Sequence, residues 1–146
     1  MLLVKPSLKE VKAASKKAPY ALLQADNSAH VVKDIQTGIT AYIIYKSYDG
    51  SSTLLKSADA ETIVMERTKE DGTVVMSVCT PDLGITQKGY TTSQKSQPLV
   101  RKVILNGNYK LDRSYDDVTL AADGGQTVIE ATCLNGQPVE FILVKQ

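Results

Sequence analysis

Three tyrosines, Tyr42, Tyr45 and Tyr48, lie close together in the sequence and have the chemistry to contact a sugar. A tyrosine ring presents an apolar face to the sugar, and its hydroxyl can hydrogen-bond to the sugar hydroxyls. The chain contains no tryptophan, the commonest residue for stacking against sugars. Tyrosines in an apolar run more often pack in a core or an interface. We therefore expect packing for this group and keep Tyr42 and Tyr45 as candidate carbohydrate contacts.

Basic residues form the second candidate group. Lys88, Lys95, Arg101 and Lys102 surround the polar segment 86–98. If these side chains share one face, an anionic polysaccharide could lie along it, and Lys88, Arg101 and Lys102 would be its contacts. The formal net charge of the chain is only +1, so we expect no general attraction to nucleic acid.

No set of residues predicts catalysis. His30 is the only histidine, and no nucleophile motif lies near it in the sequence. A catalytic histidine needs a reacting group and an orienting group around it, so we expect His30 to be a strand residue held by packing and a hydrogen bond. The acidic segment 112–117 lacks the alternating spacing and the glycine of a calcium-binding loop, which favours a polar turn.

The two cysteines, Cys79 and Cys133, lie in strand-like runs. We expect buried thiols rather than a disulfide, although the sequence leaves that pairing open. Two cysteines and one histidine are too few for a four-ligand structural zinc site. We therefore expect no catalytic residue, no cofactor and no metal in this chain.

Apolar and polar side chains alternate with a period of two over most of the chain, which indicates short β-strands. The candidate residues are therefore expected to lie on strands or in the turns between them. Strand-like runs occur at 20–24, 29–33, 39–46, 53–57, 62–68, 74–79, 99–106, 109–111, 118–121, 127–134 and 139–145. The run 74–79 is the central one, since it is β-branched and apolar and is followed by Pro81, which cannot donate to a strand ladder. The sequence predicts an all-β fold, an antiparallel two-sheet β-sandwich of about ten strands.

Turn residues support antiparallel pairing. Asp49-Gly50, Asp71-Gly72, Asn106-Gly107 and Asn135-Gly136 each separate two strand-like runs, and Asp123-Gly124-Gly125 adds a fifth turn of the same kind. These residues tolerate the positive φ angles of tight hairpin turns. We therefore expect the runs on either side of each turn to pair with each other.

The amino-terminal segment 1–18 differs from the rest. Five lysines alternate there with Leu8, Val11 and Ala14, at a spacing that places the apolar residues on one face of a helix ended by Pro19. We interpret it as a short helical or linker segment, or as the end of a preceding domain, and 19–146 as the β-sandwich domain. No apolar stretch approaches the roughly 20 residues of a membrane span, so we expect no membrane partner.

Five strand motifs follow one another along the chain: Tyr20-Ala-Leu-Leu-Gln24, Ala29-His-Val-Val-Lys-Asp34, Thr40-Ala-Tyr-Ile-Ile-Tyr45, Val74-Val-Met-Ser-Val-Cys-Thr-Pro-Asp-Leu83 and Val103-Ile-Leu-Asn-Gly107. Their order resembles the carboxy-terminal domain of polysaccharide lyase family 8, most closely the chondroitin sulfate ABC lyases. The resemblance covers nearly everything after Pro19.

The resemblance implies a part of a secreted or periplasmic enzyme, whose signal peptide would lie outside this chain. Such enzymes cleave uronate-containing polysaccharides by β-elimination, with catalytic residues in a helical domain and a central sandwich. No position here matches those residues, so none is transferred, and the chain alone should be inactive. Its implied partners are the catalytic and central domains of the same polypeptide and, through the whole enzyme, chondroitin sulfate, dermatan sulfate or hyaluronan.

Two functions follow. A non-catalytic domain that braces the central domain, and could border the substrate cleft, should expose an apolar docking face of several hundred Å². An autonomous carbohydrate-binding module for an anionic polysaccharide should instead expose a tyrosine surface or a basic groove. The absence of tryptophan and the modest net charge favour the bracing domain.

Overall fold

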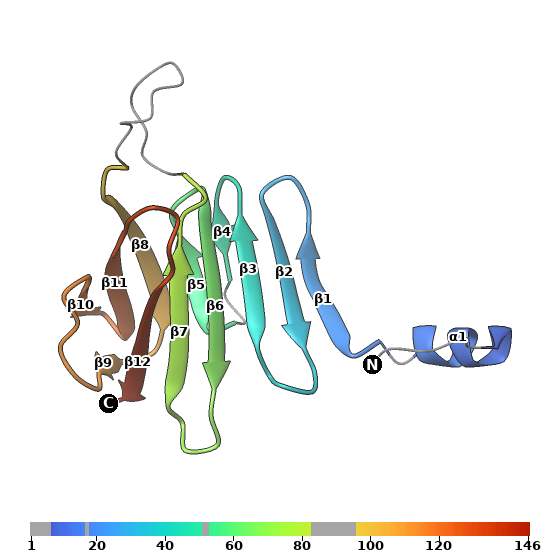
Figure 1. The fold of residues 1–146 in the computed structure, drawn as a ribbon. Helices are drawn as coiled ribbons and strands as arrows, with labels where there is room; N and C mark the ends of the chain where they lie inside the picture. The colour runs from blue at the N-terminus through green and yellow to red at the C-terminus, as the bar shows by residue number, and fades with distance from the viewer. Residues whose placement is uncertain (1–6, 17, 51–52, 83–95) are drawn as a thin grey trace, which may run out of the picture.

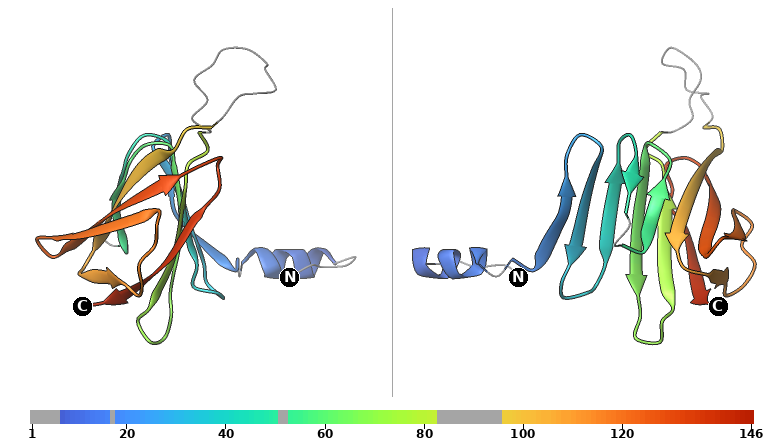
Figure 2. Two further views of the ribbon diagram at one scale, coloured as in Figure 1. Left: turned by 60° about the vertical axis from the view of Figure 1, so that its left-hand side comes forward. Right: turned by 180° about the vertical axis from the view of Figure 1, so that it is seen from behind.

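Two antiparallel β-sheets pack face to face in the computed structural model, which describes residues 7–16, 18–50, 53–82 and 96–146 (Figures 1 and 2). The seven-stranded sheet has the order β1 (Tyr20–Ala25), β2 (Ala29–Asp34), β3 (Thr40–Ile44), β6 (Thr62–Thr68), β7 (Val74–Cys79), β12 (Val139–Lys145) and β9 (Tyr109–Leu111). The five-stranded sheet has the order β10 (Val118–Asp123), β11 (Gln126–Cys133), β8 (Leu99–Asn106), β5 (Leu55–Ala58) and β4 (Tyr48–Asp49). The predicted all-β sandwich is confirmed.

The core lies between the sheets and follows the period of two. In β7, Val74, Met76 and Val78 are buried, and the residues between them point to the opposite face. The facing strand β11 buries Ile129 and Ala131 in the same way. Each large apolar side chain that is fully buried contributes about 1.5–3 kcal/mol to the free energy of folding. Burial of these inward-facing side chains is therefore the main interaction that holds the two sheets together.

Two of the predicted turns close hairpins. Gly72, with φ 81°, lies between β6 and β7, which pair along their length. Gly124 and Gly125, with φ 55° and 85°, form a two-residue turn between Asp123 and Gln126, which are paired residues of β10 and β11. Positive φ at both central positions matches the right-handed twist of a hairpin.

For Asn106-Gly107 and Asn135-Gly136, the prediction that the flanking runs pair with each other is wrong. Gly107 (φ 100°) connects β8 to β9, and Asn135 (φ 57°) lies between β11 and β12, and in both cases the two strands belong to different sheets. Asp49-Gly50 does lie between two antiparallel partners, but these are β5 and β4, a short strand that the sequence did not indicate, while the predicted run 39–46 lies in the other sheet. The amide of Gly50 donates to the carbonyl of Lys56 at 2.7 Å. Local turn geometry fits in the first two cases, but the chain crosses between the layers.

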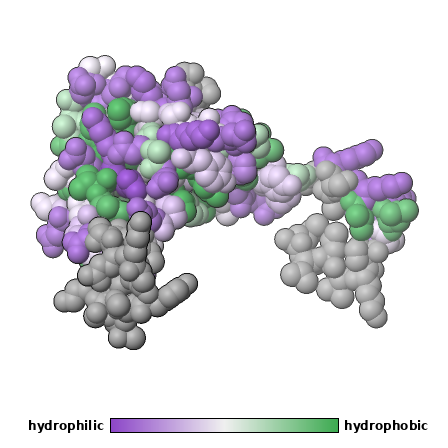
Figure 3. Space-filling view, turned by 90° about the horizontal axis from the view of Figure 1, so that it is seen from above, coloured by the Kyte–Doolittle hydropathy of each residue, from purple (hydrophilic) through white to green (hydrophobic). Residues whose placement is uncertain are grey.

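The amino-terminal helix α1 (Leu8–Ser15) stands apart from the sheets (Figures 1 and 2). Ser7 and Glu10 cap its first turn, with the Ser7 amide donating to Glu10 at 2.7 Å and the Glu10 amide donating to Ser7 Oγ at 3.3 Å. Leu8 and Val11 are exposed, and Figure 3 shows apolar and hydrophilic surfaces side by side on this helix. No helix in the described ranges is long and apolar enough to cross a membrane.

Candidate functional site: an inter-sheet cavity and an apolar sheet face

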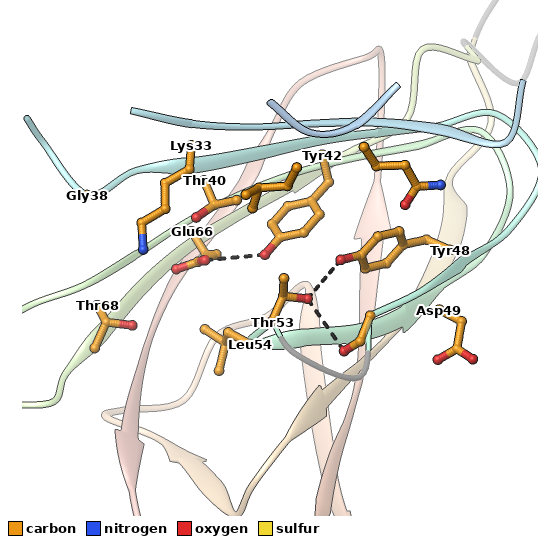
Figure 4. A pocket seen from close by; sticks show the side chains of 13 residues that line it. Lys33, Gly38, Thr40, Tyr42, Tyr48, Asp49, Thr53, Leu54, Glu66 and Thr68 are labelled. Carbon is orange, nitrogen blue, oxygen red and sulfur yellow. Dashed lines mark hydrogen bonds between the residues drawn. The ribbon is translucent and has the colours of Figure 1, made fainter. Parts of the chain in front are cut away.

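A cavity of about 680 Å³ opens between the two sheets, beside the edge of the smaller one. Its walls come from β1, β2, β3 and β6 on one side and from β4, Gly50, Thr53 and Leu54 on the other (Figure 4). Figures 1 and 2 show β1 and β2 continuing past β4, the edge strand of the smaller sheet. The cavity forms because the two sheets differ in width.

Three polar side chains follow one another along the inner face of the larger sheet. Lys33 in β2 pairs with Thr40 in β3, and Thr40 pairs with Glu66 in β6. Thr40 and Glu66 are buried, whereas Lys33 is exposed. Because adjacent strands are about 4.8 Å apart, Lys33 and Glu66 lie two strand spacings apart along this row.

Glu66 is the most unusual of these groups, since an acidic side chain only 7% exposed occupies an inward position of a strand. The Tyr42 hydroxyl donates to Glu66 Oε1 at 3.4 Å. Burial raises the pKa of the Glu66 carboxyl above its ordinary value, although hydrogen bonds from Thr40 and Tyr42 and the positive charge of Lys33 oppose the shift. Burial likewise raises the pKa of the Tyr42 hydroxyl.

A second pair of hydroxyls faces the same space from the smaller sheet. Tyr48 and Thr53 hydrogen-bond to each other at 2.8 Å, and Thr53 Oγ1 also donates to the carbonyl of Leu55 at 2.6 Å. The Tyr42 and Tyr48 rings meet edge to face, with centroids 5.4 Å apart, and Figure 4 shows both hydroxyls directed into the space between the sheets. Gly50 packs so closely here that a Cβ would collide with Tyr48, Thr53 and the carbonyl of Leu55.

The outer face of the seven-stranded sheet is apolar instead. Leu22 is 60%, Ile43 42% and Met65 44% exposed. These three residues alternate with inward positions of β1, β3 and β6 and so project from the side opposite the core. Strand register places partly exposed apolar side chains around them: Val32, Ala41, Ile63, Val75 and Ile142. These eight residues together are called the outer apolar face below.

His30 borders the outer apolar face. It lies in β2 opposite Ile43 of β3, in a strand as predicted. Its ring meets that of Tyr45 edge to face at 5.3 Å, and its Nδ1 is 3.3 Å from the Tyr45 hydroxyl. The packing and the hydrogen bond expected for His30 are therefore both present.

The three tyrosines that the sequence analysis considered as carbohydrate contacts lie in different environments. Tyr42 is 0% exposed, so its ring offers no face for stacking, and Tyr48 is buried beside it; packing is thus the outcome for both. Tyr45 is exposed next to His30. No stacking surface of all three tyrosines exists in this arrangement.

The basic residues considered as polysaccharide contacts, Arg101 and Lys102, project from opposite sides of β8. Arg101 is half-buried, and its guanidinium donates to Thr80 Oγ1 at 2.9 Å. Lys102 is exposed, and it points to the other side of β8 because neighbouring strand residues alternate. Lys88 lies outside the described residues.

The sequence analysis did not identify Glu66, Thr40 and Lys33 as candidate site residues. The pattern of the run 62–68 places Glu66 on the inward side, and an acidic residue at an inward position could have indicated a polar site.

The cysteines and the acidic segment 112–117 lie outside the cavity and the outer apolar face. Cys79 and Cys133 are free thiols, as expected, and burial raises the pKa of both. In the acidic segment, Tyr115 donates to Asp112 at 2.8 Å. Across the described ranges there is no group of three or more His, Cys, Asp or Glu side chains that could hold a metal ion.

Comparison with known proteins gives two kinds of match, and no family model matches the chain. A chondroitin sulfate ABC exolyase of Bacteroides thetaiotaomicron is 26% identical over 158 aligned residues, which cover 94% of this chain and 16% of the exolyase. The chondroitin AC lyase of Streptomyces coelicolor A3, solved in complex with chondroitin sulphate, has the same fold, with a TM-score of 0.66 and 16% identity over 97% of this chain. A mutant of that lyase gives a TM-score of 0.67.

The chain spans about a sixth of the length of these relatives, 16% of the exolyase and 17% of the AC lyase. The sequence match extends over nearly the whole chain, and the fold match includes both sheets. These matches agree with the resemblance found in the strand motifs. The chain is a domain related to a small part of the chondroitin lyases, of the type that forms the carboxy-terminal domain in polysaccharide lyase family 8.

Proposed function

We propose that this chain is the non-catalytic carboxy-terminal domain, over residues 19–146, of a secreted or periplasmic chondroitin-type lyase, and that it braces the central domain through the outer apolar face. In this proposal, the β-elimination of uronate-containing polysaccharide occurs in other domains of the same polypeptide. The segment 1–18 links the sandwich to the preceding domain. The observation that carries the proposal is the apolar character of the outer side of the larger sheet.

An antiparallel sheet that packs one face on a core usually presents polar side chains on the other. The larger sheet departs from this rule, because Leu22, Ile43 and Met65 are each 42–60% exposed on its outer side. An exposed apolar patch that continues over several strands marks an interaction site, since its burial contributes about 25 cal/mol per Å². A neighbouring domain of the same chain is the partner that this surface suits.

The proposal is tested in the complete lyase with Ile43→Lys and Met65→Lys. The matched control is Val100→Lys, because Val100 is 53% exposed on a strand of the smaller sheet. We expect the outer-face substitutions to lower the Tm of the complete enzyme by several degrees while leaving that of residues 1–146 alone unchanged. The control should leave both values unchanged.

A complementary measurement uses the lyase lacking this domain, mixed with residues 1–146 supplied separately. Binding detected by calorimetry, and lost in Ile43→Lys, would support a docking surface. Equal effects of Ile43→Lys and Val100→Lys in both assays would overturn the bracing role. Direct carbohydrate binding, the second function, is favoured by a different observation, the polar inter-sheet cavity.

A further inference from the structure

We propose that the inter-sheet cavity binds one uncharged sugar unit of an acidic polysaccharide, with Glu66 accepting hydrogen bonds from its hydroxyls and Lys33 pairing with the acidic unit next to it. The inference goes beyond the bracing role and does not depend on it. The cavity opens on the inner side of the larger sheet, whereas the outer apolar face lies on the opposite side.

Glu66 retains hydrogen-bonding capacity at the base of the cavity. It accepts hydrogen bonds from Tyr42 and Thr40. An ionised carboxylate has about four acceptor positions, so a ligand hydroxyl can use those that remain. Gln24 and Thr68 line the same cavity and add an amide and a hydroxyl. A sugar, which carries many adjacent hydroxyls, matches such a set of donors and acceptors.

The charges around the cavity determine which sugar unit can enter. Glu66 and Asp49 are acidic lining residues, and Lys33 is the one cation among the lining residues that the structure describes. A sulfate or uronate at the base would be repelled by Glu66, whereas the same group at the rim would be attracted to Lys33. The arrangement therefore selects an uncharged unit inside and an acidic neighbour outside, as in the alternating hexosamine and uronate of hyaluronan or unsulfated chondroitin.

The size and the walls of the cavity agree with this ligand. Its volume of about 680 Å³ lies within the usual range for small-molecule sites. Leu23 and Leu54 contribute apolar wall surface for the C–H faces of a sugar ring. The Tyr42 ring is fully buried and cannot stack, so we expect weak binding, with a Kd on the order of 1 mM.

The test is an amide NMR titration of residues 1–146 with three defined oligosaccharides: a hyaluronan tetrasaccharide, an uncharged N-acetylglucosamine tetramer and a fully sulfated chondroitin tetrasaccharide. We expect saturable shifts centred on Gln24, Lys33, Thr40 and Glu66 with the first two ligands and a weaker response with the third. Ligand binding should be measured at physiological salt, because screening removes non-specific attraction.

Two variants make the test specific. Lys33→Gln should weaken hyaluronan binding about two- to fivefold, as expected for one exposed ion pair, and leave the uncharged tetramer unaffected. The matched control Lys102→Gln removes an exposed cation from the other sheet and should change neither affinity. Glu66→Gln keeps the side-chain shape and should weaken the binding of both ligands.

The proposal is overturned if no saturable shifts appear at millimolar ligand, if the shifts centre on 99–102 instead, or if Lys33→Gln and Lys102→Gln have equal effects. Each outcome differs from a failure of the bracing role, which the outer-face variants test without any sugar.

Discussion

The Tyr42 hydroxyl lies 3.4 Å from a carboxylate oxygen of Glu66, and both residues are buried at inward positions of neighbouring strands. Hydroxyl donors stabilise the ionised carboxylate, but the loss of hydration on burial costs more, so the pKa of Glu66 is raised. The fold therefore contains an acid that is more easily protonated in the folded chain than in the unfolded one.

Stability should depend on pH through Glu66. Because its folded pKa exceeds its ordinary value of 4.5, its contribution is full below about pH 4.5 and is lost as the pH rises through the folded pKa. Glu66→Gln should therefore raise the free energy of unfolding at pH 7 by on the order of 1 kcal/mol, with the gain vanishing near pH 4.5. Urea unfolding at several pH values checks this.

Gly50→Ala should destabilise the domain. An added Cβ would collide with two side chains and a backbone carbonyl, so we expect a loss of about 1–3 kcal/mol in the free energy of unfolding. Gly38→Ala is the control, since a Cβ there meets nothing within 4 Å and only its φ of 72° opposes the change. Chemical denaturation should rank Gly50→Ala as the more damaging; the reverse order would contradict the close packing at Gly50.

Thr127 joins the two sheets through its hydroxyl. Thr127 Oγ1 in β11 accepts the amide of Tyr109 in β9 at 2.8 Å and donates to the carbonyl of Gly107 at 2.8 Å. Thr127→Val keeps the shape but leaves both backbone groups without this partner, so we expect a loss of about 2 kcal/mol. Thr127→Ser keeps the hydroxyl and should lose less. If valine were tolerated better than serine, the hydrogen bonds would not be important.

The thiols should react slowly in the folded protein. Cys79 and Cys133 are free, and burial raises the pKa of both, which lowers the fraction of reactive thiolate. We expect two thiols to react with a thiol reagent after denaturation and much slower reaction before it. A reducing agent should leave the Tm unchanged; a fall in Tm on reduction would instead indicate a disulfide.

The strands could be predicted from the sequence because the alternation of apolar and polar residues within one strand shows which of its faces is buried. The alternation of Val74, Met76 and Val78 with more exposed residues identifies β7 without any knowledge of its neighbours. Sheet membership is different: Asn135 has the positive φ of a hairpin turn, yet β12 pairs with β7 and β9 rather than with β11. That choice depends on side chains distant in the sequence, which local patterns do not encode.

The site was harder to predict for the same reason. Tyr42 and Glu66 are separated by 24 positions and meet only because β3 and β6 are neighbours. Tyr45, close to Tyr42 in sequence, instead contacts His30. Proximity in the sequence grouped the tyrosines, whereas strand alternation and register separated them.

The position of β12 in the larger sheet sets an order of events during synthesis. β12 lies between β7 and β9, although β7 is made about 60 residues earlier. Until 139–145 emerge from the ribosome, the edge of β7 that pairs with β12 has no partner strand. The nascent chain is therefore most exposed to aggregation just before β12 is complete, and chaperones that bind extended apolar strands would act in that interval.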